Sequence, residues 1–351
     1  MKSVNISIES LVAELAALPG VQVERARDED LLQVCVAGAS TLLRVVERAN
    51  GFPRDVQAAV LPRRAQLAPE EILLVVAPSL TAVSRQWLQA EGVGYFDLNG
   101  HLFLQAKGIY ILREPMAAKA QPSRSTEPDI FQGKAACVLH ALLQSPHHAW
   151  HVTELAQEAK VAAGTALKVC ETLEKMLWME RTGRGPLSTR KLTAPDALLD
   201  AWADKHRLKD YHIQRYYRWS GSLEELALVL GESLEKQEIP YAATLTLGAL
   251  HRAPHLSELS ELAFLLPAQA DLTALVAEHK LQPAEEGANI LFLRTKTDGA
   301  FLYRQCCEGF WVASDVQLYL DLWASPGRGK EQAAHLRRER LAKDSERLVM
   351  A

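Results

Sequence analysis

The sequence predicts a multidomain protein of mixed α/β and α+β class, and three observations lead to this prediction. The chain has 351 residues, a length that usually forms two or three domains. Apolar residues make up 48% and charged residues 23%, which is the composition of a globular protein with a buried core in each domain. Strand-like and helix-like patterns alternate in the first and last thirds, whereas the middle is mainly helical.

The composition predicts a cytoplasmic protein without a membrane span. No run of about 18 uncharged apolar residues occurs. Glu9 and Glu14 interrupt the first apolar stretch, which indicates an amphipathic helix rather than a secretory signal. The five cysteines are odd in number and form no CxxC motif, so reduced thiols are expected. Because no P-loop, GxGxxG or GxSxG motif is present, no cofactor is expected.

A stretch rich in proline and small polar residues separates the first domain from the rest of the chain. It has three prolines and mixed charge, which is typical of a solvated linker. A softer boundary follows a predicted helix that ends near Arg207. The expected parts are a first domain over 1–114, a linker over 115–130, a middle domain over 131–208 and a last domain over 209–351.

The first domain is expected to form a mixed sheet with helices. The Asn99-Gly100 pair favours a tight turn, because both residues tolerate positive φ. Proline and glycine at 19–20 end the first helix. The expected helices are 10–18, 52–65 and 80–90, and the expected strands are 31–37, 41–47, 72–77, 94–97, 102–105 and 109–113.

The middle domain has the most specific pattern in the chain. Ala166, Val169 and Leu173 lie on one face at helical spacing. Two short strands are connected by a turn that contains Gly183 and Gly185. The expected helices are 131–144, 152–159, 161–175 and 195–205, and the expected strands are 177–181 and 188–192. This order predicts a winged helix-turn-helix.

The last domain is expected to be α+β. Its first helix is amphipathic, and its final helix is long and charged. The expected helices are 222–236, 272–279, 316–323 and 329–349, and the expected strands are 262–266, 289–294, 301–303 and 309–312.

Charge is unevenly distributed, and its pattern favours double-stranded DNA as the partner of the middle domain. Residues 131–220 contain 13 Lys/Arg against 9 Asp/Glu, whereas residues 221–351 contain 13 against 19. The third helix of a winged helix can enter the major groove, and the wing contacts the backbone or the minor groove. The candidate DNA-binding residues are Thr153, Ala162, Ala163, Gly164, Thr165, Lys168, Arg181, Arg184, Arg190 and Lys191.

A metal-dependent nuclease in the first domain is the main alternative function. Such enzymes place an acid on one strand and Glu-x-Lys on the next, but this chain has Gln33 and Glu47-Arg-Ala there. Divalent metal chemistry needs two or more oxygen ligands, which Asp97 and Glu71 would have to complete. The expected outcome is an inactive domain with no catalytic residue and no metal site. Nucleotidyl transfer in the last domain is not expected either, because strand 262–266 has no carboxylate.

Four histidines, His140, His147, His148 and His151, flank the loop before the second helix of the middle domain. Their spacing does not match a zinc site, since neither cysteines nor carboxylates complete a ligand set. We expect a solvent-exposed loop that touches phosphate when its histidines are protonated.

Two segments carry a family resemblance. Residues 316–338, VQLYLDLWASPGRGKEQAAHLRR, follow the winged-helix pattern, and residues 94–100, GYFDLNG, precede a strand that ends in GIYI. In this order the sequence resembles the AbiEi-type antitoxins of bacterial type IV toxin–antitoxin systems, in their long form with an extra N-terminal domain. The resemblance spans roughly residues 72–343.

The resemblance implies a transcriptional repressor that binds inverted repeats in its own promoter, with a homodimer as the form on DNA. It implies a companion nucleotidyltransferase-like toxin, which is neutralised without a stable complex. It further suggests a restriction-endonuclease-like first domain and a degenerate nucleotidyltransferase-like last domain. An interaction scaffold without DNA binding or catalysis is a third interpretation of the sequence.

Overall fold

A computed structural model describes residues 8–26, 28, 30–115, 129–255, 259–295, 298–307 and 309–341. The described residues form a mixed α/β protein, as the sequence predicts. The chain divides into two compact units: Met1–Pro128 with Glu171–Leu177, and Asp129–Cys170 with Trp178–Ala351. Residues 116–128 of the expected linker lie outside the described part. Within the described ranges, no helix is long and apolar enough to cross a membrane.

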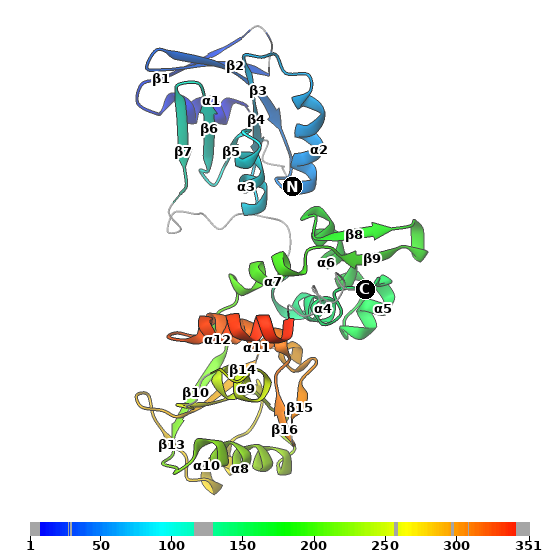
Figure 1. The fold of residues 1–351 in the computed structure, drawn as a ribbon, viewed down its shortest axis with the longest axis vertical. Coiled ribbons are helices and arrows are strands. Elements are labelled where there is room, and N and C mark those ends of the chain that lie inside the picture. Colours follow the sequence, from blue (N-terminus) through cyan, green and yellow to red (C-terminus); the bar gives the residue numbers. More distant parts are fainter. Residues whose placement is uncertain are drawn as a thin grey trace. The chain divides into compact units, whose positions relative to one another are not determined.

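A seven-stranded sheet forms the first unit, and its strands lie side by side in chain order (Figure 1). The three central strands are parallel to one another, and the outer ones pair antiparallel. The strands are β1 (Val21–Arg25), β2 (Leu31–Val36), β3 (Ala39–Glu47), β4 (Glu71–Ala77), β5 (Gly94–Asp97), β6 (Leu102–Ala106) and β7 (Ile109–Arg113). The helices are α1 (Ile8–Ala16), α2 (Pro53–Arg64) and α3 (Ala82–Ala90).

Helices cover both faces of this sheet. Leu11 and Leu15 of α1 pack into one buried cluster with Leu74 of β4. Val56 of α2 and Leu88 of α3 pack into a second cluster. Because side chains alternate along a strand, β4 contributes to both clusters, which explains its nearly continuous apolar sequence.

The chain from residue 129 onward begins with three helices and a two-stranded ribbon, and all of these belong to the second unit except the end of α6 from Glu171. The order agrees with the sequence expectation, but two boundaries shift. Helix α6 begins at Ala163 because Lys160 has a left-handed backbone (φ 52°) and starts a turn. The ribbon begins at Met179 because Leu177 (φ 61°) ends the helix. The elements are α4 (Gly133–Gln144), α5 (Val152–Glu158), α6 (Ala163–Lys175), β8 (Met179–Thr182), η1 (Gly185–Leu187), β9 (Thr189–Leu192) and α7 (Pro195–Ala203).

A second seven-stranded sheet follows, with the order β13-β10-β14-β12-β11-β16-β15. Its strands are β10 (His212–Tyr217), β11 (Ala242–Ala243), β12 (Leu262–Pro267), β13 (Gln282–Pro283), β14 (Ile290–Thr295), β15 (Gln305–Cys307) and β16 (Phe310–Val312). The helices are η2 (Leu208–Asp210), α8 (Leu223–Lys236), α9 (Leu245–Arg252), α10 (Thr273–Glu278), η3 (Asp298–Phe301), α11 (Asp315–Ala324), α12 (Gly329–Leu336) and the π-helical η4 (Arg337–Leu341).

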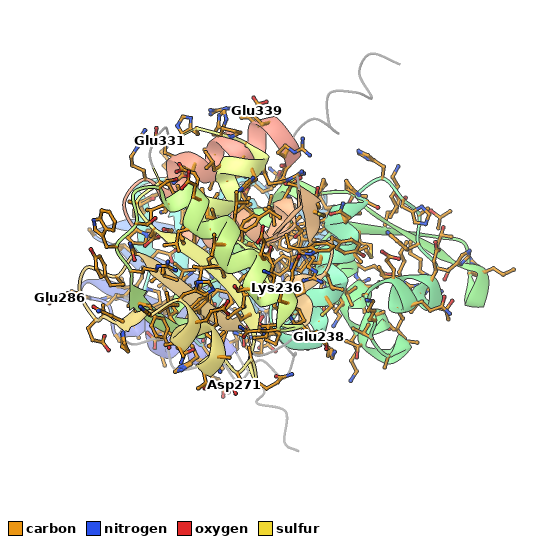
Figure 2. The ribbon with its side chains drawn as sticks, turned by 90° about the horizontal axis from the view of Figure 1, so that it is seen from below. Lys236, Glu238, Asp271, Glu286, Glu331 and Glu339 are labelled. Atoms are coloured by element: carbon orange, nitrogen blue, oxygen red, sulfur yellow. The ribbon has the colours of Figure 1, made fainter. Side chains whose placement is uncertain are left out.

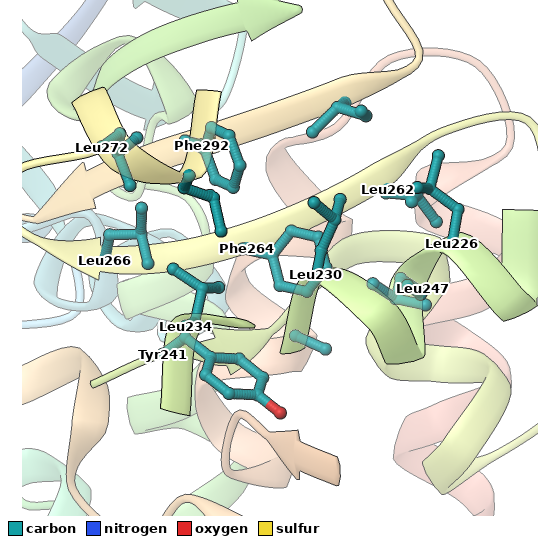
Figure 3. Close-up of a cluster of buried hydrophobic side chains, with 14 of the residues drawn as sticks. Leu226, Leu230, Leu234, Tyr241, Leu247, Leu262, Phe264, Leu266, Leu272 and Phe292 are labelled. Carbon is teal, nitrogen blue, oxygen red and sulfur yellow. The ribbon is translucent and has the colours of Figure 1, made fainter. Parts of the chain in front are cut away.

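Helix α8 closes one face of this sheet. Leu226, Leu230 and Leu234 recur at helical spacing and are buried against Phe264 of β12 and Phe292 of β14 (Figure 3). A further cluster on other side chains of the same strands includes Ala263, Leu265 and Leu293. The sheet is therefore buried on both faces, which accounts for the apolar strand β12.

Two expectations for this part of the chain are wrong. Residues 301–303 do not form a strand, because Phe301 ends the 3-10 helix η3 and Tyr303 has a left-handed backbone (φ 60°). The final α-helix ends at Leu336 and continues as the π-helical turn η4, rather than extending unbroken from residue 329. Residues 342–349 of that expected helix lie outside the described part.

Buried polar contacts fix α7 and the start of β10 to α11. The Asp321 carboxylate of α11 is fully buried and accepts hydrogen bonds from His206 Nε2 (2.8 Å) and the Tyr211 hydroxyl (2.8 Å). It also accepts from Thr244 Oγ1 (2.6 Å) and Gln317 Nε2 (2.9 Å). The buried Asp321 carboxylate thus links the segment after α7 and the start of α9 to α11.

Candidate nucleic-acid interface

The turn between α5 and α6 determines which residues of α6 face solvent. Lys160 N donates to Gln157 O (3.1 Å), and Val161 N donates to Ala156 O (2.9 Å), which closes the end of α5. Ala166 and Val169 then turn inward and are buried. The opposite side of the first turn of α6 is left at the surface.

The predicted contact residues of α5 and α6 lie mostly on this surface. Ala163, Gly164 and Lys168 are exposed, and Thr165 is half-buried. A Cβ atom added at Gly164 would meet no other atom within 4 Å, so the space before this turn is open. Thr153, in the first turn of α5, is also exposed. The first turn of α6 is therefore a smooth surface of small side chains.

The ribbon β8–β9 projects from the second unit as a narrow arm (Figures 1 and 2). Arg181, Arg184 and Lys191 are exposed. Gly183 (φ 82°) and Gly185 (φ 65°) flank Arg184, and their left-handed backbone makes the reversal at the tip possible. The arm therefore presents three cationic side chains to solvent.

Arg190 differs from the other cationic residues of the ribbon. It is only 4% exposed, and its backbone pairs with Trp150 through two hydrogen bonds of 2.8 and 2.9 Å. A buried guanidinium in this position does not face an approaching duplex. Arg190 is therefore not expected to contact DNA.

Acidic residues occur on the parts of the second unit that are remote from the ribbon. Figure 2 labels Glu331 and Glu339 on one side of it, and Glu238, Asp271 and Glu286 on other sides. The Arg328 and His255 side chains lower the pKa of the Glu331 carboxyl to about 2, so it stays anionic. Glu331 and Glu339 lie in a segment that also contains Arg328, Lys330, Arg337, Arg338 and Arg340, so this side is not acidic overall. Glu238, Asp271 and Glu286 belong to segments in which acids outnumber lysines, and a polyanion would be repelled there.

The acids weighed for a nuclease site in the first unit have structural partners. Glu47 Oε1 accepts from the Ile8 amide (2.7 Å), and Glu71 pairs with Arg44 (2.7 Å), which lowers the pKa of the Glu71 carboxyl. Asp97 is fully buried and accepts hydrogen bonds from its own loop. Among the described residues, no three His, Cys, Asp or Glu side chains are placed to hold a metal ion.

The expectation of a fully exposed histidine loop is wrong for His140. This residue is 2% exposed, and its ring meets Trp202 edge-on at 4.8 Å. Burial lowers the pKa of His140 to about 4, so the ring is neutral near pH 7. The apolar helical spacing around His140 was the sequence signal for its burial. His148, by contrast, lies at the surface and contacts Glu154 (2.9 Å).

Comparison with known protein families finds that part of the second unit is similar to a family of transcriptional regulators. Residues 191–342 match the family described as "Transcriptional regulator, AbiEi antitoxin, Type IV TA system". The resemblance inferred from the sequence is confirmed for these residues, which begin in β9 and include α7, the second sheet and α12. Neither the curated proteins nor the solved structures gave a match.

Proposed function

We propose that this protein is a DNA-binding transcriptional regulator that acts as the antitoxin of a type IV toxin–antitoxin system. The observation that carries the proposal is the family match over residues 191–342. The match begins in β9, the second strand of a ribbon that follows three helices. We interpret these helices and the ribbon, with their exposed cationic side chains, as a winged helix-turn-helix.

The first turn of α6 is the proposed reading element. The major groove is about 12 Å wide and admits a helix whose first residues meet base edges. Exposed Ala163 and Gly164 would allow close approach, and the Thr165 methyl group suits a thymine methyl. Lys168, one turn later, would reach a guanine or a phosphate. Thr153 would contact the backbone from the start of α5.

The ribbon is the proposed wing. Arg181, Arg184 and Lys191 would neutralise phosphates or enter a minor groove, and such contacts make the affinity fall with salt. The acid-rich segments that contain Glu238, Asp271 and Glu286 would repel the duplex from their side of the second unit. The proposal therefore predicts a strong dependence on salt and a separate dependence on the first turn of α6.

The other parts of the proposal come from the antitoxin family. We propose that the protein binds inverted repeats in its own promoter as a homodimer, in the cytoplasm, and so represses its own transcription. Its companion would be a nucleotidyltransferase-like toxin. The first unit would be a restriction-endonuclease-like domain without activity. The second sheet would be a degenerate nucleotidyltransferase-like domain, and the absence of carboxylates from β12 supports this.

Fluorescence anisotropy on the upstream DNA of the gene, against scrambled DNA, tests the proposal at about 50 and 200 mM salt. We expect tighter binding to the upstream DNA and a steep loss at the higher salt. The double variant Arg184→Ala/Lys191→Ala should reduce the salt slope by about 2. Lys236→Ala, on the exposed side of α8, is the control and should leave the slope unchanged.

Gly164 offers a matched test of the groove contact. Gly164→Asp adds a negative charge where the structure has open space, so binding should be lost while the fold is kept. Gly164→Ala is the control, since it adds only a methyl group. Retained binding by Gly164→Asp would contradict the assignment of α6 as the reading helix.

A further inference from the structure

A cleft of about 480 Å³ lies between α5 and the turn that follows η3, within the second unit. Such a volume is in the range of small-molecule sites. Helix α5 contributes Glu154, Gln157 and Glu158 to its lining, and Phe301 and Tyr303 face them from the second-sheet part. The cleft is therefore lined on one side by α5, the helix that precedes α6, and on the other side by the segment that matches the antitoxin family.

The chemistry of the lining is that of a site for cations. Glu154 receives a hydrogen bond from His148, which lowers the pKa of the Glu154 carboxyl and keeps it ionised. Glu158 supplies a second carboxylate. Lys160 is the one cationic residue of the lining, so the acids outnumber it. Phe301 and Tyr303 also line the cleft, and aromatic rings attract amines and guanidinium groups.

The Tyr303 hydroxyl positions Glu158 in this cleft. It donates a hydrogen bond to Glu158 Oε1 at 2.6 Å. Burial and the neighbouring carboxylate raise the pKa of the Tyr303 hydroxyl, so it remains a donor at neutral pH. The hydrogen bond involves only one of the two Glu158 oxygens. A bound cation can therefore pair with Glu158 without breaking the link to Tyr303.

We propose that the cleft between α5 and the η3 turn binds a small organic cation through an amine or guanidinium group. A metal ion is a poorer match, because no suitable cluster of ligands occurs in the described part of the chain. DNA is also a poor match, because the carboxylates would repel its phosphates. The site is thus distinct from the DNA-contacting surface proposed above, and its test needs no DNA.

Isothermal titration of the full chain with agmatine, at fixed ionic strength, tests the proposal. Agmatine carries both an amine and a guanidinium group. We expect saturable binding with one site per chain. Glu158→Gln keeps the size and an acceptor oxygen but removes the charge, and it should weaken binding at least tenfold. Glu232→Gln, on the exposed side of α8, is the matched control and should bind like the parent protein.

Gln157 gives a second test that does not disturb the Glu158–Tyr303 contact. Its side chain is exposed, so substitutions there should be tolerated. Gln157→Lys should weaken agmatine binding, and Gln157→Glu should strengthen it. The proposal is overturned if the parent protein shows no saturable binding. It is also overturned if Glu232→Gln lowers the affinity as much as Glu158→Gln, since the attraction would then be a general effect of net charge.

Discussion

Two fully buried aspartates, Asp97 in the first unit and Asp321 in the second, show how one side chain can stabilise very different parts of a fold. Asp97 accepts from the backbone amides of Leu80, Asn99 and His101, at 3.0–3.1 Å. These donors belong to two loops, one after β4 and one after β5, which are interior strands of the first sheet. Asp97 therefore organises a loop where a strand ends.

The hydrogen bonds that Asp321 accepts come instead from side chains, and these lie at widely separated positions. His206 and Tyr211 precede it by more than 100 residues, and Thr244 begins α9. A buried carboxylate in this arrangement connects elements that the backbone does not bring together. The comparison teaches that burial of an acid alone does not indicate its role, whereas the sequence distance to its donors does.

Asp321→Ala should produce the largest effect. It removes the acceptor of four donors, of which those of Thr244 and Gln317 are buried, and we expect a loss of about 3–5 kcal/mol in the unfolding free energy of the second unit. Hydrogen exchange read by mass spectrometry distinguishes the units, and the peptides of the first sheet should keep their protection. Equal loss of exchange protection in both sheets would contradict the prediction that Asp321 stabilises only the second unit.

Acid should weaken the second unit next most strongly, because His140 is buried in its neutral form. Its folded-state pKa of about 4 lies below the value of about 6.5 expected when unfolded. The unfolded chain therefore takes up a proton first as the pH falls below about 6.5, and stability drops. We expect a loss of about 2 kcal/mol between pH 7.5 and 5.

Urea unfolding at the two pH values measures this loss. His140→Leu should reduce it, because the substituted residue does not titrate in either state. An unchanged pH dependence in His140→Leu would mean that other groups cause the acid sensitivity.

Asp97→Ala should have a smaller and more local effect. Its donors are mainly backbone amides of loops that remain near solvent, so we expect a loss of about 1–2 kcal/mol. Exchange should accelerate at the loops around residues 80 and 99, while β4 keeps its protection. Loss of exchange protection across the whole first sheet would mean that Asp97, like Asp321, stabilises more than its own loops.

Arg337→Ala should have the smallest effect of the series. Arg337 joins η4 to α7 through Asp196 (2.7 Å) and Asp200 (2.5 Å), but both acids are more than half exposed. Such pairs contribute about 0.5–1 kcal/mol. Thermal unfolding should show a small shift that shrinks at high salt, whereas the Asp321→Ala effect should persist.

The first sheet could be predicted largely from the sequence, and the second only in part. Strands β2 to β7 are marked by apolar runs and glycine-containing turns, and each pairs with its chain neighbour. In the second sheet, β11 and β13 have only two residues each, too few for a periodic pattern. Strand β10 and helix α9 were also missed. The HIQRYY sequence of β10 places polar residues on a partly exposed strand, which hides its alternation.

The candidate interface could be predicted better at the level of elements than of single residues. The helix order and the positions of Arg184 and Lys191 at the surface follow from spacing and glycine turns. The burial of Arg190 could not be predicted, because it depends on pairing with Trp150, forty residues earlier. Likewise, the Glu158–Tyr303 contact joins residues 145 positions apart and leaves no local pattern.

The two strand orders have a consequence for synthesis on the ribosome. In the first sheet every strand finds its partner as soon as the next segment emerges. Strand β10 must wait for β13 and β14, since Tyr216 pairs with Pro283 and Ile290. At about 5–20 residues per second, the delay until β14 emerges is roughly 4–15 s. During that time β10 is an unpaired strand in a nascent chain. We therefore expect a chaperone to bind this segment during synthesis.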